Sequence, residues 1–179
     1  SEPVVMARIS PDGKHIAYIT QDKTHSGLWI QDLDRVEPRK LAGTDGAQFP
    51  FWSPDSQFIG YGTTTELRSV PVIRGDPVTI CQLPVKDEPF LGGTWSRTGQ
   101  SIVFTQVSRR FFEVPARGGT PKILGEIDAS TKIEHVEHPQ HLPGDGKQLL
   151  FMFKKIGQQH AFGRFSLESG KHEVLAPIG

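Results

Sequence analysis

The sequence predicts an all-β fold made of four repeats, each with four short antiparallel strands. A turn motif that recurs at a fixed interval predicts it, together with the short apolar runs that flank each copy. The motif SPDG begins at Ser10, SPDS begins 43 residues later at Ser53, and the same interval leads to Ser96 in TWSRTGQ. A looser fourth copy, LPGDGK, contains Pro143 and Asp145.

Each copy of the motif has the residues of a tight turn between two strands. Serine suits the first position of a type I turn, proline presets φ at the second, and glycine is favoured at the fourth. Around Ser10 the chain reads ARISPDGKHIAYIT, which is the pattern of a β-hairpin. We therefore expect Asp12, Asp55 and Asp145 to cap backbone amides within their own turns.

The hairpin is the first half of each repeat, and two further strand-like runs complete it. After the first hairpin these runs are LWIQDL and PRKLAG, and after the third they are FFEVP and PKILGE. Four strands in 40 to 50 residues are typical of one blade of a β-propeller. We place the blades at residues 4–42, 47–84, 90–125 and 134–176 of a single partial propeller domain. A β-sandwich also has short strands, but it does not explain a regular internal repeat.

Composition excludes several classes of function. Twenty basic residues balance twenty acidic ones, so there is no electrostatic footprint for nucleic acid. The single cysteine, Cys81, excludes an internal disulfide and a cysteine-based metal site, and we expect it to be buried. No apolar run is long enough to cross a membrane, and SEPVV has no export signal, which is either absent or removed. Localisation is left open by these observations.

The repeats resemble a known family. The pattern SPDGK-x-IAY, LWIQDL, PRKLAG is similar to the WD40-like PD40 repeat of TolB-type propellers, and the second repeat, FPFWSPDSQFIGYG, matches it as closely. With GGTWSRTGQSIVFT and VPARGGTP, the whole chain resembles the propeller region of certain bacterial serine/threonine kinases and transcriptional regulators. The resemblance implies a protein-binding or sensor module, and a periplasmic or extracytoplasmic location if the chain is TolB-like.

We therefore predict a noncatalytic binding module, the sensor or scaffold part of a larger bacterial protein. Its partner would be a protein, a peptide or a small anionic ligand, and we expect no cofactor. One alternative is a propeller that gates a prolyl-oligopeptidase-like hydrolase, and another is a self-standing enzyme with its site in the channel. Neither a G-x-S-x-G nucleophile motif nor a phosphate-binding loop occurs, and we assign no catalytic residue.

The ligand site is expected at the channel mouth, on the face that carries the longer links. In a propeller the first strand of each blade lines the channel, which here gives VVMARI, AQFPFW, FLGGTW and HVEHPQHL. We predict Arg109, Arg110, His135 and His138 as ligand-binding residues, because these polar groups have no counterpart in the other repeats. Adjacent arginines suit a carboxylate or phosphate.

His135, His138 and His141 form H-x-x-H-x-x-H, with Glu134 and Glu137 between them. In a regular strand His135 and His141 would face one side and His138 the other, which does not assemble three ligands on one metal. An irregular backbone would let two histidines and a carboxylate converge. From the regular pattern we predict no metal site.

Four blades are few for a propeller of this type, and all four repeats look complete. The outer faces of the first and last blades would expose apolar surface, which proteins avoid. We expect either a homodimer that closes an eight-bladed ring or a half-propeller attached to further domains. Trp52 and Trp95, at matching places in two blades, are expected to pack between blades.

Overall fold

The computed structural model describes residues 4–20, 27–155, 157 and 159–177. These residues form four separate sheets, each with four antiparallel strands joined in chain order. The all-β class and the four four-stranded propeller blades predicted from the repeat are confirmed. The link QDKTHS, which the sequence placed on the ligand face, lies outside the described residues.

Each blade takes its strands from one repeat. Blade 1 contains β1 (Val4–Ile9), β2 (His15–Thr20), β3 (Leu28–Asp32) and β4 (Arg39–Lys40). Blade 2 contains β5 (Gln48–Trp52), β6 (Phe58–Gly62), β7 (Glu66–Pro71) and β8 (Val78–Gln82). Blade 3 contains β9 (Phe90–Trp95), β10 (Ser101–Gln106), β11 (Arg110–Pro115) and β12 (Lys122–Glu126). Blade 4 contains β13 (Ile133–His141), β14 (Gln148–Lys155), β15 (His160–Ser166) and β16 (His172–Pro177).

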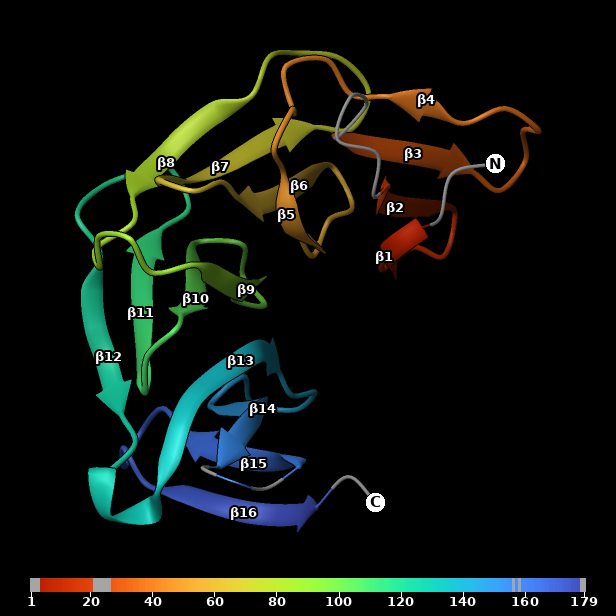
Figure 1. Cartoon of the computed structure of the whole chain (residues 1–179). Coiled ribbons are helices and arrows are strands. Elements are labelled where there is room, and N and C mark those ends of the chain that lie inside the picture. The colour runs from red at the N-terminus through yellow and green to blue at the C-terminus, as the bar shows by residue number, and fades with distance from the viewer. Residues whose placement is uncertain (1–3, 21–26, 156, 158, 178–179) are drawn as a thin grey trace.

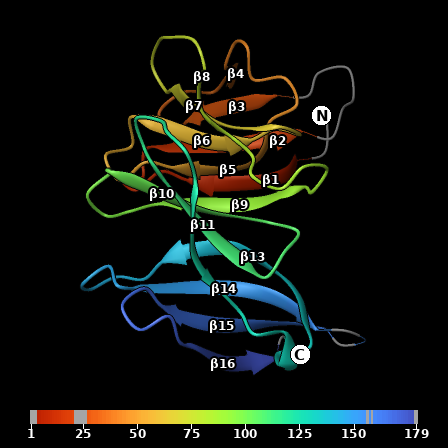
Figure 2. The same ribbon diagram turned by 90° about the vertical axis from the view of Figure 1, so that its left-hand side faces the viewer.

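The four blades follow one another around an arc. Their first strands, β1, β5, β9 and β13, line the inner side of the arc, and each contacts the next along the series (Figure 1). Turned by 90°, blades 1 and 2 overlap in the upper part of the view, and blade 4, in blue, lies in the lower part (Figure 2). Within the described residues, one face of blade 1 and one face of blade 4 have no neighbouring blade (Figure 1).

In the part of the chain that the structure describes, the core consists of three clusters of buried side chains. The first lies between blades 1 and 2, where Ala17 and Ile30 meet Trp52 and Ile59. The second lies between blades 2 and 3 and the third between blades 3 and 4. Apolar burial therefore stabilises each blade mainly through its neighbours. Trp52 and Trp95 both belong to these clusters, which confirms that they pack between blades.

The turns have the local hydrogen bonds that their residues predict. The carboxylate of Asp12 accepts a hydrogen bond of 3.0 Å from the amide of Lys14, and Asp55 accepts one of 3.0 Å from Gln57. Asp145 accepts one of 2.9 Å from Lys147. The predicted capping role of these aspartates is confirmed. The hydrogen bonds from Ser10 and Lys14 also lower the pKa of the Asp12 carboxyl.

A short 3₁₀ helix, Ala129–Thr131, lies in the link between blades 3 and 4. The carboxylate of Asp128 caps it by accepting a hydrogen bond of 2.7 Å from the amide of Ser130. In the part of the chain that the structure describes, no helix is long and apolar enough to cross a membrane.

Candidate functional site: the channel face

A cavity of about 410 Å³ lies on the channel face of the arc. All four blades line it, mainly through their inner strands. The lining residues are Arg8–Pro11 of blade 1, Phe49–Trp52 of blade 2, Gly92–Thr94 of blade 3 and His138–Gln140 of blade 4. A cavity that requires all four blades cannot be assigned to any single repeat.

The inner strands are bulged where they pass the cavity. The register of β5 shifts between Gln48 and Phe51, and that of β13 shifts between Glu137 and Gln140. At these points Phe49 (φ +49°) and His138 (φ +50°) have left-handed backbone conformations, and each precedes a proline. Proline is tolerated at a bulge, and a bulge re-aims a side chain. The sequence thus places two unlike side chains at equivalent positions of two blades.

Phe49 and His138 meet across blade 3. The centroids of their rings are 5.3 Å apart, with the ring planes inclined by 59°. The corresponding residue of β9 is Gly92 (φ +116°), and a Cβ atom there would lie 3.3 Å from the Cα of His138. Glycine is therefore required between the two blades, because a side chain would strain the backbone and crowd the histidine.

The imidazole of His138 is held toward its neutral form. Burial lowers its pKa, since a charged imidazole loses hydration there, and the positive charges of Arg8 and His160 act in the same direction. The carboxylate of Glu137 opposes them. A neutral imidazole offers one hydrogen-bond donor and one acceptor beside the apolar ring of Phe49. This combination suits an amphipathic group of a ligand.

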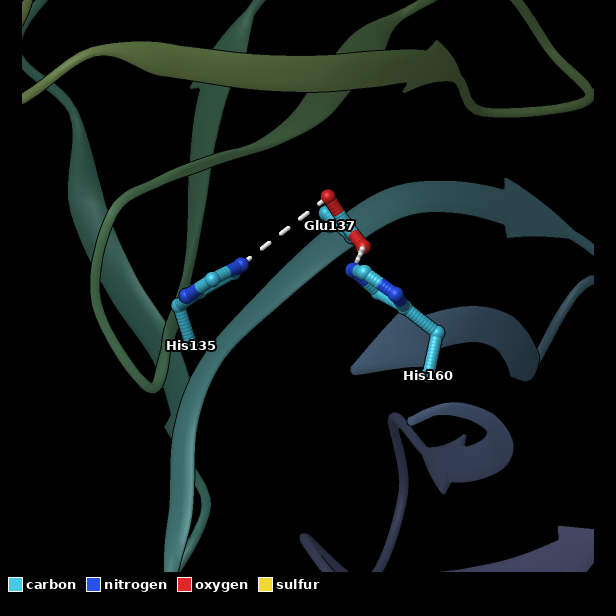
Figure 3. A group of neighbouring side chains, drawn as sticks. All are labelled: His135, Glu137 and His160. Atoms are coloured by element: carbon cyan, nitrogen blue, oxygen red, sulfur yellow. Dashed lines mark ion pairs between the residues drawn. The ribbon is translucent and has the colours of Figure 1, made fainter. Parts of the chain in front are cut away.

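Of the four predicted ligand-binding residues, His138 alone lines this cavity. Arg110 Nε lies 3.1 Å from a carboxylate oxygen of Glu126, and Arg109 Nη2 lies 3.8 Å from the other. His135 lies beside Glu137 and His160 (Figure 3). The structure therefore separates the two arginines, already paired with a carboxylate, from His138. A shared ligand-binding role for the four residues stays a prediction.

The predicted parity of the three histidines is wrong. The bulge of β13 adds a residue between Glu137 and Gln140, so His135 pairs with Lys154 whereas His141 pairs with Leu149. Side chains of successive β14 residues alternate between faces, which places His135 and His141 on opposite faces of the sheet. His141 instead approaches Thr94 of blade 3, with Nδ1 3.4 Å from Oγ1.

A larger cavity, of about 630 Å³, lies between the turns of blades 2 and 3. Its lining includes Ser53–Asp55 and Thr98, residues of the repeated turn. The Asp55 carboxylate is already used within that turn, where it accepts from the hydroxyl of Ser53 and the amide of Gln57. We regard the channel cavity as the candidate site, because its unlike side chains serve no repeated structural purpose.

Sequence reasoning missed Phe49, Gly92 and His160. Phe49 and His138 are the residues before the prolines in FPF and EHPQ, and this shared X-Pro signal inside two inner strands could have identified the bulges. No comparable signal exists for His160, because it lies on a different strand from His135 and Glu137. Its place depends on strand pairing.

Comparison with known proteins supports a TolB-like fold. No family model matches the sequence. The Tol-Pal system protein TolB of Alcanivorax borkumensis is 38% identical over 63 residues, which are 33% of this chain and 14% of that protein. The crystal structure of TolB from Acinetobacter baumannii superposes with a TM-score of 0.78 at 18% identity, over 99% of this chain and 44% of that one.

An enzyme shares the same architecture. Oligogalacturonate lyase, solved in complex with manganese, superposes with a TM-score of 0.69 at 12% identity, over 96% of this chain and 51% of that one. Identities this low show the fold alone. The chain spans less than two thirds of the length of each of these proteins. The arc of four blades described above has a TolB-like β-propeller fold.

Proposed function

We propose that this chain is a protein-binding module that receives a segment of a partner on the channel face of its four blades. The observation that carries the proposal is the cavity lined by all four inner strands, with Phe49 and His138 in contact on its wall. A TolB-like fold suits a protein-binding role. Residues at the bulges differ from blade to blade, as a specific site requires.

The chemistry of the site suits an amphipathic peptide segment. The Phe49 ring offers an apolar contact, and the neutral imidazole of His138 can donate or accept one hydrogen bond. Arg8 also lines the cavity, and this positively charged residue is exposed. We infer that an apolar side chain with a nearby carboxylate on the partner fits this combination best.

Arg109 and Arg110 extend the proposal toward an anionic partner. Both guanidinium groups lie within 3.8 Å of the carboxylate of Glu126, which they share. Arg109 and Arg110 side chains are 34% and 43% exposed, which leaves donors available to a partner. Alanine at either position should weaken binding of an acidic partner without a large fall in melting temperature.

Site-specific cross-linking tests the binding face. The photo-reactive residue p-benzoylphenylalanine is placed at Phe49, and in a control variant at Val36, which is 95% exposed in the link between β3 and β4. After illumination in an extract of the source cells, we expect a discrete protein adduct from position 49 and none from position 36. Adducts from position 36 alone would contradict the proposal.

We also propose that a second copy of the chain covers the open face of blade 1. Tyr18 pairs with Ala7 on one side and Trp29 on the other, so the three side chains share a face. The Tyr18 and Trp29 rings stack at 6.5 Å, and Ile9 on the same face is 63% exposed. Apolar and aromatic side chains of these kinds also form the clusters that pack between blades elsewhere in the arc.

A further inference from the structure

Three side chains of blade 4 point their ligand atoms at one another. Glu137 lies between His135 and His160, with one carboxylate oxygen 3.0 Å from His160 Nε2 and the other 3.9 Å from His135 Nε2 (Figure 3). One ligand atom from each residue lies within 4.8 Å of the other two. In the described part of the chain this is the one group of three such residues found this close together.

The strand pairing of blade 4 brings the three residues together. His135 of β13 and His160 of β15 both pair with Lys154 of β14, so the two histidines share a face of the sheet. Glu137 is two residues beyond His135 and faces the same way. The amine of Lys154 is directed to Glu134, 3.5 Å away, so that its charge is matched by a carboxylate outside the cluster.

We propose that His135, Glu137 and His160 bind a divalent first-row transition-metal ion such as Zn²⁺. Two imidazole nitrogens and a carboxylate oxygen are a common set of protein ligands for zinc and for iron(II). Magnesium and calcium prefer oxygen ligands, so two imidazoles disfavour them. Three protein ligands leave at least one coordination position for water or for a partner group.

Metal binding requires the three ligand atoms to move closer together. Ligand atoms bound at about 2.0–2.2 Å around a tetrahedral ion are roughly 3.4 Å apart. One ligand atom from each residue now lies within 4.8 Å of the other two, so side-chain rotation has to bring the longer separations toward that value. Both histidines present Nε2 to the carboxylate, and with a metal bound at Nε2 each imidazole would carry its proton on Nδ1.

The low exposure of two of the three side chains favours a specific metal site over a chance contact at the surface. The side chains of Glu137 and His135 are 12% and 18% exposed, whereas that of His160 is 44% exposed. The first two are positioned by β13 and its bulges, and the third is accessible to an entering ion. The group lies on the face of blade 4 opposite Val136, Phe151 and Phe153, which pack against blade 3. The site thus adds a binding function separate from the channel cavity.

The test is metal titration of the full chain after treatment with a chelator. We expect calorimetry to show one Zn²⁺ per chain, and Co²⁺ to give a visible absorption band. Loss of an outer-shell partner of a metal ligand lowers metal affinity roughly 10-fold to 100-fold. Because His160 and Glu137 would be direct ligands, His160→Ala and the nearly isosteric Glu137→Gln should each weaken Zn²⁺ binding by at least this factor. His15→Ala is the matched control, because His15 Nδ1 also contacts a carboxylate, Asp32 at 2.7 Å, but among the described residues it belongs to no such group of three ligands.

Two results would overturn the proposal: absence of stoichiometric Zn²⁺ binding by the wild-type chain, or variants of the cluster that bind Zn²⁺ as tightly as His15→Ala does. To distinguish misfolding of a variant from loss of a metal ligand, its near-ultraviolet circular dichroism spectrum is compared with that of the wild type, both in the presence of chelator. A measurement on the wild type alone adds an independent check. Zn²⁺ should shift the imidazole resonances of His135 and His160 while leaving those of His15 in place.

Discussion

The indole nitrogen of Trp52 donates a hydrogen bond of 2.9 Å to the backbone oxygen of Arg8, and so joins the inner strand of blade 2 to that of blade 1. The hydrogen bond lies at the rim of the channel cavity, which both residues line. A second link between the same blades runs from the amide of Asp12 to the hydroxyl of Ser56, at 3.2 Å. These polar contacts thus fix the angle between blades 1 and 2, whose apolar faces pack together.

Trp52→Phe should destabilise the chain. The substitution keeps an aromatic ring in the core but leaves the Arg8 carbonyl without this donor, which costs about 1 kcal/mol of unfolding free energy. Trp29→Phe is the matched control, because among the described residues the buried Trp29 Nε1 has no partner to lose. Urea denaturation should show the larger loss for Trp52→Phe. Equal losses would show that the hydrogen bond contributes nothing beyond packing.

Valine at Gly13 and valine at Ser56 should both destabilise the chain. The turns place Gly13 at φ +70° and Ser56 at φ +60°, and a β-branched residue strains this conformation by about 1 kcal/mol or more. The sequence alone ranks Ser56 as the milder site. The structure adds a buried hydroxyl that accepts from Asp12, so we expect Ser56→Val to cost at least as much. A smaller melting shift for Ser56→Val would contradict this ranking.

Cys81 should react slowly in the folded chain. Burial raises the pKa of its thiol to about 11, so little of the reactive thiolate is present near neutral pH. Reaction with a disulfide reagent such as DTNB should be slow in buffer and complete rapidly in guanidinium. Equally rapid reaction in both conditions would mean that the strand containing Cys81, β8, opens readily.

Stability should fall as the pH drops below about 6.5, partly because of His141. Burial lowers the pKa of this imidazole from its usual 6.5, although Glu113 opposes the shift. As the pH falls, His141 is therefore protonated at a higher pH in the unfolded chain than in the folded chain. Its contribution to the free energy of unfolding is complete above the unfolded pKa and is lost as the pH falls toward the folded pKa. His141→Gln should reduce the difference in unfolding free energy between about pH 7.5 and about pH 5.5. An unchanged difference would exclude this histidine as a source.

The isolated chain should sediment as a dimer at micromolar concentration. A mass twice the 19.8 kDa of one chain is expected, and Ile9→Lys should shift it toward the monomer because Ile9 lies on the apolar open face of blade 1. Val36→Lys, at an exposed position of the β3–β4 link, is the control and should leave the mass unchanged. A wild-type monomer would contradict the dimer.

The blade architecture could be predicted because it follows from short-range patterns. Turn residues at Ser10 and Ser53 define hairpins locally, and alternating apolar residues define strand faces. The inner packing of Trp52 and Trp95 followed from their matching positions in two repeats. Each of these inferences depends on residues close together in the chain, or on the repeat itself.

The candidate site could be predicted only in part. His138 was identified as an unrepeated polar residue, but the contact with Phe49 depends on two bulges and on the space above Gly92. The histidine parity failed for the same reason, because period two holds only in an unbulged strand. Arg109 and Arg110 were recognised as a pair, although their shared partner Glu126 comes from the neighbouring strand.

The sequence by itself determined that the chain is a row of four similar blades, because a repeat imposes the same local turns and strand faces each time. Tertiary structure decided which unlike side chains meet. Phe49 reaches His138 across blade 3, and His160 reaches Glu137 through the pairing of β13, β14 and β15. Such contacts depend on bulges, strand register and the angle between blades, which arise from the packing of the whole arc and not from any one segment.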